Sequence, residues 1–166
     1  GLEYGADDYI TKPFEIDVLR VKIENILTNR RKLKEYYVHP NPGMPSEEIE
    51  MLPSLDKEFL AKVIEAIQNQ IGNPELSVVS LVMQIGMGRT VFYNKLKALT
   101  GQSPNEFIRT QRMHKAMQLL LEQRYTINEI SDMVGFADSK YFSTTFRKFF
   151  GKSPSKYLLE NDEQMH

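Results

Sequence analysis

The stretch SVVSLVMQIGMGRTVFYNKLKALTGQSP, residues 77–104, decides the fold, because its pattern returns as TINEISDMVGFADSKYFSTTFRKFFGKSP at residues 126–154. Each copy predicts a short capped helix, a turn with glycine, a second helix with an apolar seam, and then Gly-x-Ser-Pro. Equivalent residues lie 49 positions apart before the turn and 50 apart after it. Such a repeat indicates one supersecondary unit used twice, and helix, tight turn, helix is the helix-turn-helix shape.

Capping signals set the expected helix bounds. Ser77 and Thr126 are the predicted N-caps of the first helix in each unit. The predicted segments are a first helix-turn-helix at 77–100, a connecting helix at 103–122, a second helix-turn-helix at 126–150 and a last helix at 153–160. An amphipathic helix at 54–71, capped by Ser54 or Asp56, precedes them, and the tail after Glu160 is expected to fray. These elements predict an all-α, seven-helix tandem helix-turn-helix domain over 54–160.

Composition narrows the possible functions. The 166 residues include no cysteine, which excludes disulfides and cysteine metal sites, and no apolar run approaches the ~20 residues of a membrane span. No catalytic constellation, metal site or cofactor-binding glycine-rich loop is visible, so we expect neither an enzyme nor a cofactor. The net charge is −1, yet residues 73–159 hold 12 Lys or Arg against 6 Asp or Glu. A basic segment that contains the repeat is typical of nucleic-acid binding, although ordinary surface scatter explains it equally well.

The second helix of each repeat combines an apolar back with a polar front, as a helix in the DNA major groove requires. The candidate base-contacting residues are Arg89, Thr90, Tyr93 and Asn94 in the first repeat, and Ser139, Lys140, Ser143, Thr144 and Arg147 in the second. The candidate phosphate contacts are Lys97, Ser103, Lys152 and Ser153, with Arg109, Arg112, Lys115 and Lys156 as further cations. Arginine matches guanine and asparagine matches adenine in the major groove. The alternative is that these side chains form ordinary solvated faces.

Two stretches, IGMGRTVFYNKLKALTGQSPNEFI (85–108) and ISDMVGFADSKYFSTTFRKFFGKSPSKYL (130–158), resemble the DNA-binding domain of the AraC/XylS family. The resemblance implies two helix-turn-helix units joined by a long helix, which bind successive major-groove segments of double-stranded DNA. It also implies a homodimer in the full-length protein. The sequence departs from the family pattern at Val82 and Ser131, where alanine is common, and at Gly88, where a capping serine is frequent.

The N-terminal stretch GADDYITKPF, residues 5–14, resembles the end of a two-component receiver domain. By that resemblance, residues 1–35 are the C-terminal fragment of a receiver, with one strand and a helix from Phe14 to Leu33, and Lys12 is its phosphoryl-contacting lysine, non-functional here. The Lys12–Pro13 bond would then be cis. Residues 36–53, with four prolines, are predicted to be a linker. The implied partners are an upstream receiver and a histidine kinase.

These observations together favour a sequence-specific DNA-binding transcription regulator that is the output domain of a two-component phosphorelay. The alternative is a protein–protein signalling module that uses the helical domain without DNA. We expect a cytoplasmic location and no membrane contact by this fragment, although a full-length hybrid sensor would be anchored in the membrane. Because Gly1 is not a natural start, we expect a piece of a longer protein.

Overall fold

The computed structural model describes residues 20–21, 23–25, 27–28, 31 and 52–165. Within these residues the secondary structure is helical, and seven helices follow Leu52. They are α4 (Ser54–Gln68), α5 (Val78–Ile85), α6 (Arg89–Thr100), α7 (Pro104–Leu121), α8 (Ile127–Met133), α9 (Ser139–Phe150) and α10 (Pro154–Met165). The predicted all-α, seven-helix architecture is confirmed. The predicted strand, the Lys12–Pro13 bond and almost all of the linker lie outside the described residues.

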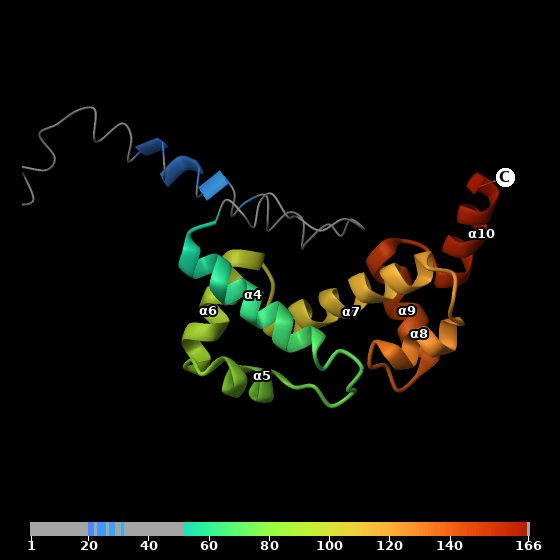
Figure 1. The fold of residues 1–166 in the computed structure, drawn as a ribbon, viewed down its shortest axis with the longest axis horizontal. Helices are drawn as coiled ribbons and strands as arrows, with labels where there is room; N and C mark the ends of the chain where they lie inside the picture. Colours follow the sequence, from blue (N-terminus) through green and yellow to red (C-terminus); the bar gives the residue numbers. More distant parts are fainter. Residues whose placement is uncertain (1–19, 22, 26, 29–30, 32–51, 166) are drawn as a thin grey trace, which may run out of the picture.

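The helix α7 runs between two groups of helices, with α4, α5 and α6 at one end and α8, α9 and α10 at the other (Figure 1). We call these groups the first and the second unit. The first half of α7 gives Phe107 and Ile108 to the core of the first unit, whereas its second half gives Met113, Ala116 and Met117 to that of the second. Since one helix of 18 residues contributes to both cores, it joins the two units as a shared element.

The N-terminal caps form as the sequence predicts. Ser77, Ser103 and Thr126 each accept a hydrogen bond from the backbone N–H three residues on, and all three ends close as capping boxes. The repeat also ends its helices alike, because Gly101 and Gly151 both adopt a left-handed conformation after α6 and α9. The bounds of the two helix-turn-helix units therefore follow from local capping chemistry.

Two predicted helix ends are wrong. The N-cap of α4 is Pro53 without a side-chain hydrogen bond, so neither Ser54 nor Asp56 caps it, and α4 ends at Gln68 rather than Ile71. The helix α10 continues to Met165 instead of fraying after Glu160. It is tied down by an ion pair between Lys152 and Glu160 and by a 3.3 Å hydrogen bond from Gln123 Nε2 to Asp162 Oδ1. Side-chain contacts from outside the helix thus hold the segment that was expected to fray.

The described residues between Arg20 and Arg31 are helical, in agreement with the predicted helix from Phe14 to Leu33. Their large apolar side chains are exposed, Val21 by 55%, Ile23 by 48% and Leu27 by 59%. This apolar surface is therefore not part of either described core. None of the helices in the described ranges is long and apolar enough to cross a bilayer.

Candidate nucleic-acid interface

The buried seams of α6 and α9 fix which side chains face outward. In α6 the side chains of Phe92, Leu96 and Leu99 are at most 1% exposed, and in α9 those of Phe142 and Phe146 are equally buried. These residues recur at helical spacing, so the opposite side of each helix points to solvent. We call α6 and α9 the recognition helices.

Three pairs of equivalent positions, each 50 residues apart, make up the outer faces of the recognition helices. The pairs are Thr90 and Lys140, Asn94 and Thr144, and Lys97 and Arg147, and all six side chains are exposed. The Thr144 hydroxyl donates to the Lys140 carbonyl at 3.0 Å. Donors and acceptors of this kind match the exposed edges of bases in the major groove. The first unit offers one cation on this face and the second offers two.

The other candidate residues lie at the side of each recognition helix rather than at its front. Tyr93 is half-buried against the core of the first unit, and the Arg89 guanidinium stacks over its ring with 5.6 Å to the centroid. In the second unit Ser139 and Ser143 are also half-buried, and the Ser139 hydroxyl donates to Asn128 Oδ1 of α8 at 2.6 Å. The Arg89–Tyr93 contact lies within α6, whereas the Ser139 hydrogen bond ties the start of α9 to α8.

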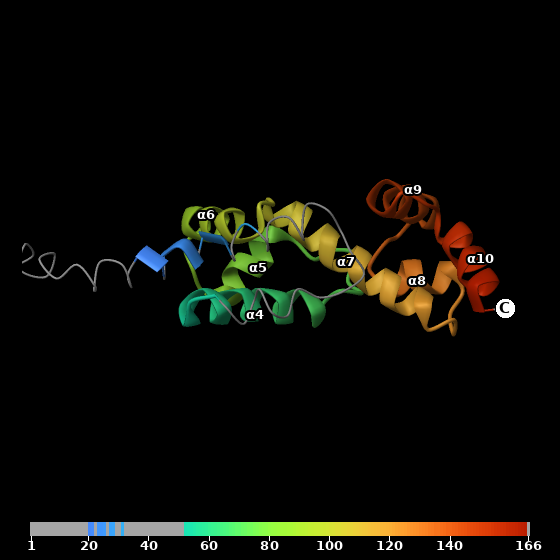
Figure 2. The same ribbon diagram turned by 90° about the horizontal axis from the view of Figure 1, so that it is seen from above.

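Both recognition helices lie along the same side of the elongated molecule, and α4 lies on the opposite side from α6 (Figure 2). The two recognition helices therefore do not lie on opposite sides of the shared helix α7 (Figure 2).

Two exposed side chains on the recognition faces were missed by the sequence reasoning. Val91 is 57% exposed and Tyr141 is 55% exposed, and they occupy equivalent positions in α6 and α9. The Tyr141 ring packs against Phe136 with 5.7 Å between centroids, which restricts its motion. Apolar side chains in the major groove contact the thymine methyl group. Helical spacing from Asn94 and Thr144 back by three residues would have identified both positions.

The predicted phosphate contacts differ in whether another group of the protein already binds them. Lys97 is exposed, whereas the Ser103 and Ser153 hydroxyls already accept hydrogen bonds from the Glu106 and Lys156 backbone at 3.3 and 3.2 Å. Lys152 forms an ion pair with Glu160, and this partner raises the pKa of Lys152. A phosphate that binds at Lys152 therefore competes with a carboxylate of the protein itself. In the described part of the chain, no three His, Asp or Glu side chains are grouped as a metal ion would require.

Comparison with known proteins extends this description. The helix-turn-helix domain family matches residues 81–160. A curated relative, Histidine kinase P4 of Formosa agariphila, is 40% identical over 164 residues, which is 99% of this chain and 12% of that protein. The chain thus spans about an eighth of that relative's length.

Solved structures agree with the family match. The DNA-binding domain of AdpA, a global transcriptional factor solved with a target DNA, superposes with a TM-score of 0.58 at 27% identity, covering 63% of this chain and 94% of that one. The C-terminal domain of AraT, a response regulator from Geobacillus stearothermophilus, gives 0.56 at 28% identity, covering 61% and 84%.

The expectation that the chain is not an enzyme agrees with these structural matches, which are domains of regulators. The capping boxes, the two apolar seams and the shared α7 are found in residues that the family match covers or adjoins. The helical part of this chain is therefore similar to the helix-turn-helix DNA-binding domains of transcription regulators, which supports the predicted AraC/XylS-type domain.

Proposed function

We propose that this chain is the DNA-binding output domain of a two-component phosphorelay and acts as a sequence-specific transcription regulator. The observation that carries the proposal is the placement of two exposed polar faces, on α6 and α9, along one side of the molecule (Figure 2). Because α7 contributes to both cores, the two faces are held in a defined relation. The location is expected to be cytoplasmic, where the DNA is.

The roles of single residues are proposed from their exposed positions. Thr90, Asn94, Lys140 and Thr144 are proposed to contact base edges, with Arg147 beside them and with Val91 and Tyr141 as contacts to thymine methyl groups. Arg89, Tyr93, Ser139 and Ser143 support this surface from its sides, while Lys97, Ser103, Lys152 and Ser153 flank it as phosphate contacts. Phosphate contacts orient a protein on the duplex, and base contacts select the sequence.

The phosphorelay part of the proposal rests on the N-terminal resemblance and on two relatives. The relative Histidine kinase P4 aligns with 99% of the chain, which includes the receiver-like stretch. The AraT domain comes from a response regulator. In such an order of domains, phosphorylation of an upstream receiver controls a DNA-binding domain, for which homodimer formation is the simplest route.

Selection of bound sequences from random duplexes tests the DNA-binding part, with the full 166-residue chain as bait. Once a preferred duplex is known, Arg147→Ala and Lys140→Ala are expected to weaken its binding by about 1–3 kcal/mol each without lowering the melting temperature. The matched control is Lys62→Ala, which removes the same charge from the exposed side of α4.

Salt dependence separates DNA binding from the protein-binding alternative. Neutralised phosphates release counterions, so the affinity for DNA should fall steeply as salt rises. The proposed function would be contradicted if the selection enriched no sequence and if salt did not weaken the binding. Phosphorelay control is tested separately, since a phosphomimetic receiver in the full-length protein should bind the same duplex more tightly than the unmodified one.

A further inference from the structure

One arginine of α7 connects the two units through backbone carbonyls. The Arg112 guanidinium donates from Nη2 to the Asn73 carbonyl at 2.7 Å and from Nη1 to the Gly135 carbonyl at 3.0 Å. Asn73 lies in the loop after α4, in the first unit, and Gly135 lies in the turn between α8 and α9, in the second. No Asp or Glu among the described residues forms an ion pair with Arg112.

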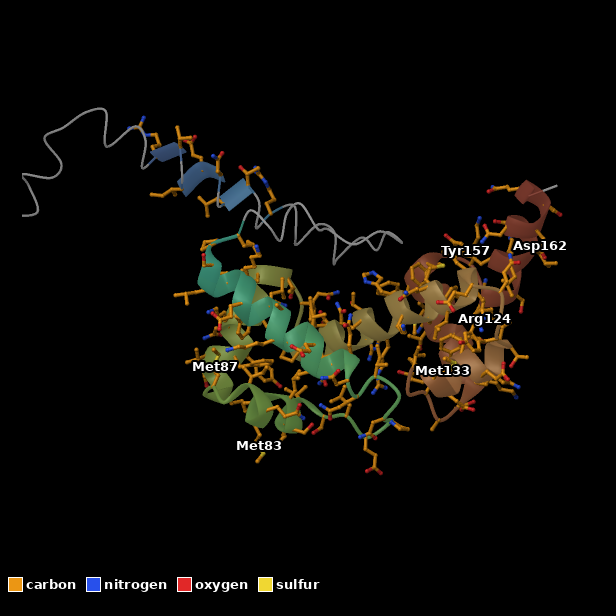
Figure 3. The ribbon with its side chains drawn as sticks, in the orientation of Figure 1. Met83, Met87, Arg124, Met133, Tyr157 and Asp162 are labelled. Atoms are coloured by element: carbon orange, nitrogen blue, oxygen red, sulfur yellow. The ribbon has the colours of Figure 1, made fainter. Side chains whose placement is uncertain are left out.

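The loop that supplies the first carbonyl is itself ordered. The Asn73 N–H donates to the Gln70 carbonyl at 2.9 Å, and the Leu76 N–H donates to the Asn73 carbonyl at 3.2 Å. The Asn73 side chain also accepts from the Glu75 N–H at 3.0 Å. This loop extends toward α8 in Figure 1, and Met133, labelled at the end of α8 in Figure 3, lies on the facing side. The Asn73 carbonyl is therefore held in place by hydrogen bonds of its own loop, independently of Arg112.

The two backbones also touch directly at this point. A Cβ added at Gly135 would lie 2.6 Å from the Ile71 carbonyl oxygen and 3.0 Å from Arg112 Cζ, and one added at Gly72 would lie 3.2 Å from the Met133 oxygen. Only glycine permits such an approach, and Gly135 has a positive φ of 82°. Loop, turn and guanidinium therefore form one packed joint.

The joint leads directly to the second recognition helix. Gly135 precedes Phe136, which is 7% exposed and packs edge-on against Phe142 of α9 with 5.4 Å between ring centroids. A shift of the Gly135 carbonyl is therefore transmitted to α9 through a buried aromatic contact. The Arg112 guanidinium is partly removed from water, and this burial lowers its pKa. It donates hydrogen bonds to the two carbonyls.

We propose that Arg112 is a positioning residue that locks the orientation of the second recognition helix relative to the first and thereby sets the spacing of the two DNA elements that the domain accepts. Arg112 acts through Asn73 and Gly135 and has no contact with DNA in this proposal. The spacing consequence rests on the proposed DNA-binding function, whereas the locking itself does not.

The locking is measured without DNA. Because the chain has no cysteine, spin labels at Met83→Cys on α5 and Lys148→Cys on α9 report one distance between the units without background labelling. Both positions are exposed. The parent is expected to give a narrow distance distribution, and Arg112→Met, which keeps the unbranched stem and removes the donors, is expected to broaden it. Arg124→Ala is the matched control, since it removes an exposed arginine that lies just after the same helix.

The spacing is measured on the preferred duplex of the parent protein, with one base pair inserted between its two elements. The insertion moves the second element by roughly 3.4 Å and rotates it by roughly 35°. A protein with a fixed orientation of its two units then cannot bind both DNA elements at once. We therefore expect the affinity of the parent to fall about 100-fold. Arg112→Met should lose about 10-fold or less, because its two units can change their relative orientation, whereas Arg124→Ala should keep the penalty of the parent.

An unchanged distance distribution and an unchanged spacing penalty in folded Arg112→Met would overturn the proposal. If Arg112→Met does not fold, Arg112→Lys is subjected to both measurements, since it keeps charge and stem but loses the planar fork that spans two carbonyls. If the parent itself selects no duplex, the proposed DNA function fails, and the spin-label distances still decide whether Arg112 locks the units.

Discussion

The two helix-turn-helix units share a pattern, but their turns have different surroundings. Gly86 and Gly135 occupy equivalent positions, and both have a positive φ, 74° and 82°. Nothing lies within 4 Å of a Cβ built at Gly86, whereas one built at Gly135 meets Ile71 and Arg112. The first glycine serves only its own turn, while the second also lets two parts of the chain pack together. The same local motif thus has a tertiary role in one copy and none in the other.

The cores of the units differ as well. Behind α9 the second unit packs a series of aromatic rings, in which Phe146 contacts Phe142, Phe150 and Tyr157 with centroid distances of 4.7–6.3 Å. In the first unit a buried polar contact joins the end of α6 to α7, since the Thr110 hydroxyl donates to Gln102 Oε1 at 3.0 Å.

The largest expected effects test whether the two seams are equivalent. Phe92→Ala and Phe142→Ala each remove a ring that is at most 1% exposed, and each should lower the free energy of unfolding by about 3–5 kcal/mol. Urea denaturation followed by circular dichroism measures both. A near-neutral result for either variant would show that the corresponding side chain is not part of a close-packed core.

The glycine pair gives a matched test of the turns. Alanine in a left-handed conformation costs about 1–2 kcal/mol, which is the whole effect expected for Gly86→Ala. At Gly135 the added methyl group also collides with backbone, and overpacking adds about 1–3 kcal/mol. Thermal or urea unfolding of the two variants should therefore rank Gly135→Ala as the more damaging. Equal losses would indicate that Ile71 and Arg112 move aside freely.

Acid is expected to weaken the second unit through His114, whose ring packs edge-on against Phe149 with 5.8 Å between centroids. Burial lowers the pKa of His114 to about 4 from an ordinary 6.5. Between about pH 4 and pH 6.5, the His114 imidazole is therefore protonated in the unfolded chain but neutral in the folded one. The contribution of His114 to the free energy of unfolding is complete above about pH 6.5. It falls as the pH is lowered to about 4, by about 3 kcal/mol in total. Unfolding of His114→Gln measured at pH 7 and pH 4.5 should show a smaller difference than the parent.

Sequence periodicity and capping predicted most of the fold and the exposure of six candidate side chains on α6 and α9, because these features depend on residues close in the chain. The predicted end of α4 is wrong, because the apolar stripe continues to Ile71 whereas the helix ends at Gln68 and a turn follows. There the Ile71 carbonyl approaches Gly135 of the other unit, a contact that no local pattern encodes.

The role of Arg112 was missed for the same reason. On the sequence it is one of several cations on a long helix, and its partners are two carbonyls at positions 73 and 135. Every residue has a backbone carbonyl, so the residue types at positions 73 and 135 do not indicate that these carbonyls bind Arg112. The predicted phosphate contact of Lys152 stays a prediction, and the sequence pattern did not reveal that Glu160 pairs with it.

The N-caps of the recognition helices offer a smaller test. The Asp138 side chain accepts from the Lys140 N–H at 2.9 Å, whereas Gly88 provides no side-chain cap for α6. Asp138→Ala should cost about 1 kcal/mol, and Gly88→Ser should stabilise the fold by a few tenths, that is about 0.3 kcal/mol. Thermal melts of both variants measure this difference. A loss on Gly88→Ser would mean that the serine side chain does not reach the free N–H groups of α6.

Another small effect concerns the ends of the two units, where Lys152 occupies the position equivalent to the buried Gln102. If Lys152 contacts DNA phosphate, Glu160→Gln should release it and raise the affinity for the preferred duplex. An exposed ion pair is weak, so the expected gain is only about two- to fivefold. Fluorescence anisotropy at low salt measures it, because screening reduces the effect as salt rises.

Removal of any acid makes the domain more attractive to DNA, so the control must separate contact from net charge. Glu163→Gln removes the same charge from an exposed position on the same helix, but Glu163 is not the partner of Lys152. A gain specific to Glu160→Gln, abolished when Lys152→Ala is added, would identify Lys152 as a phosphate contact that its own helix α10 holds back. An equal gain in both variants would assign the effect to overall charge, and Lys152 would then belong to the stability of α10 rather than to the interface.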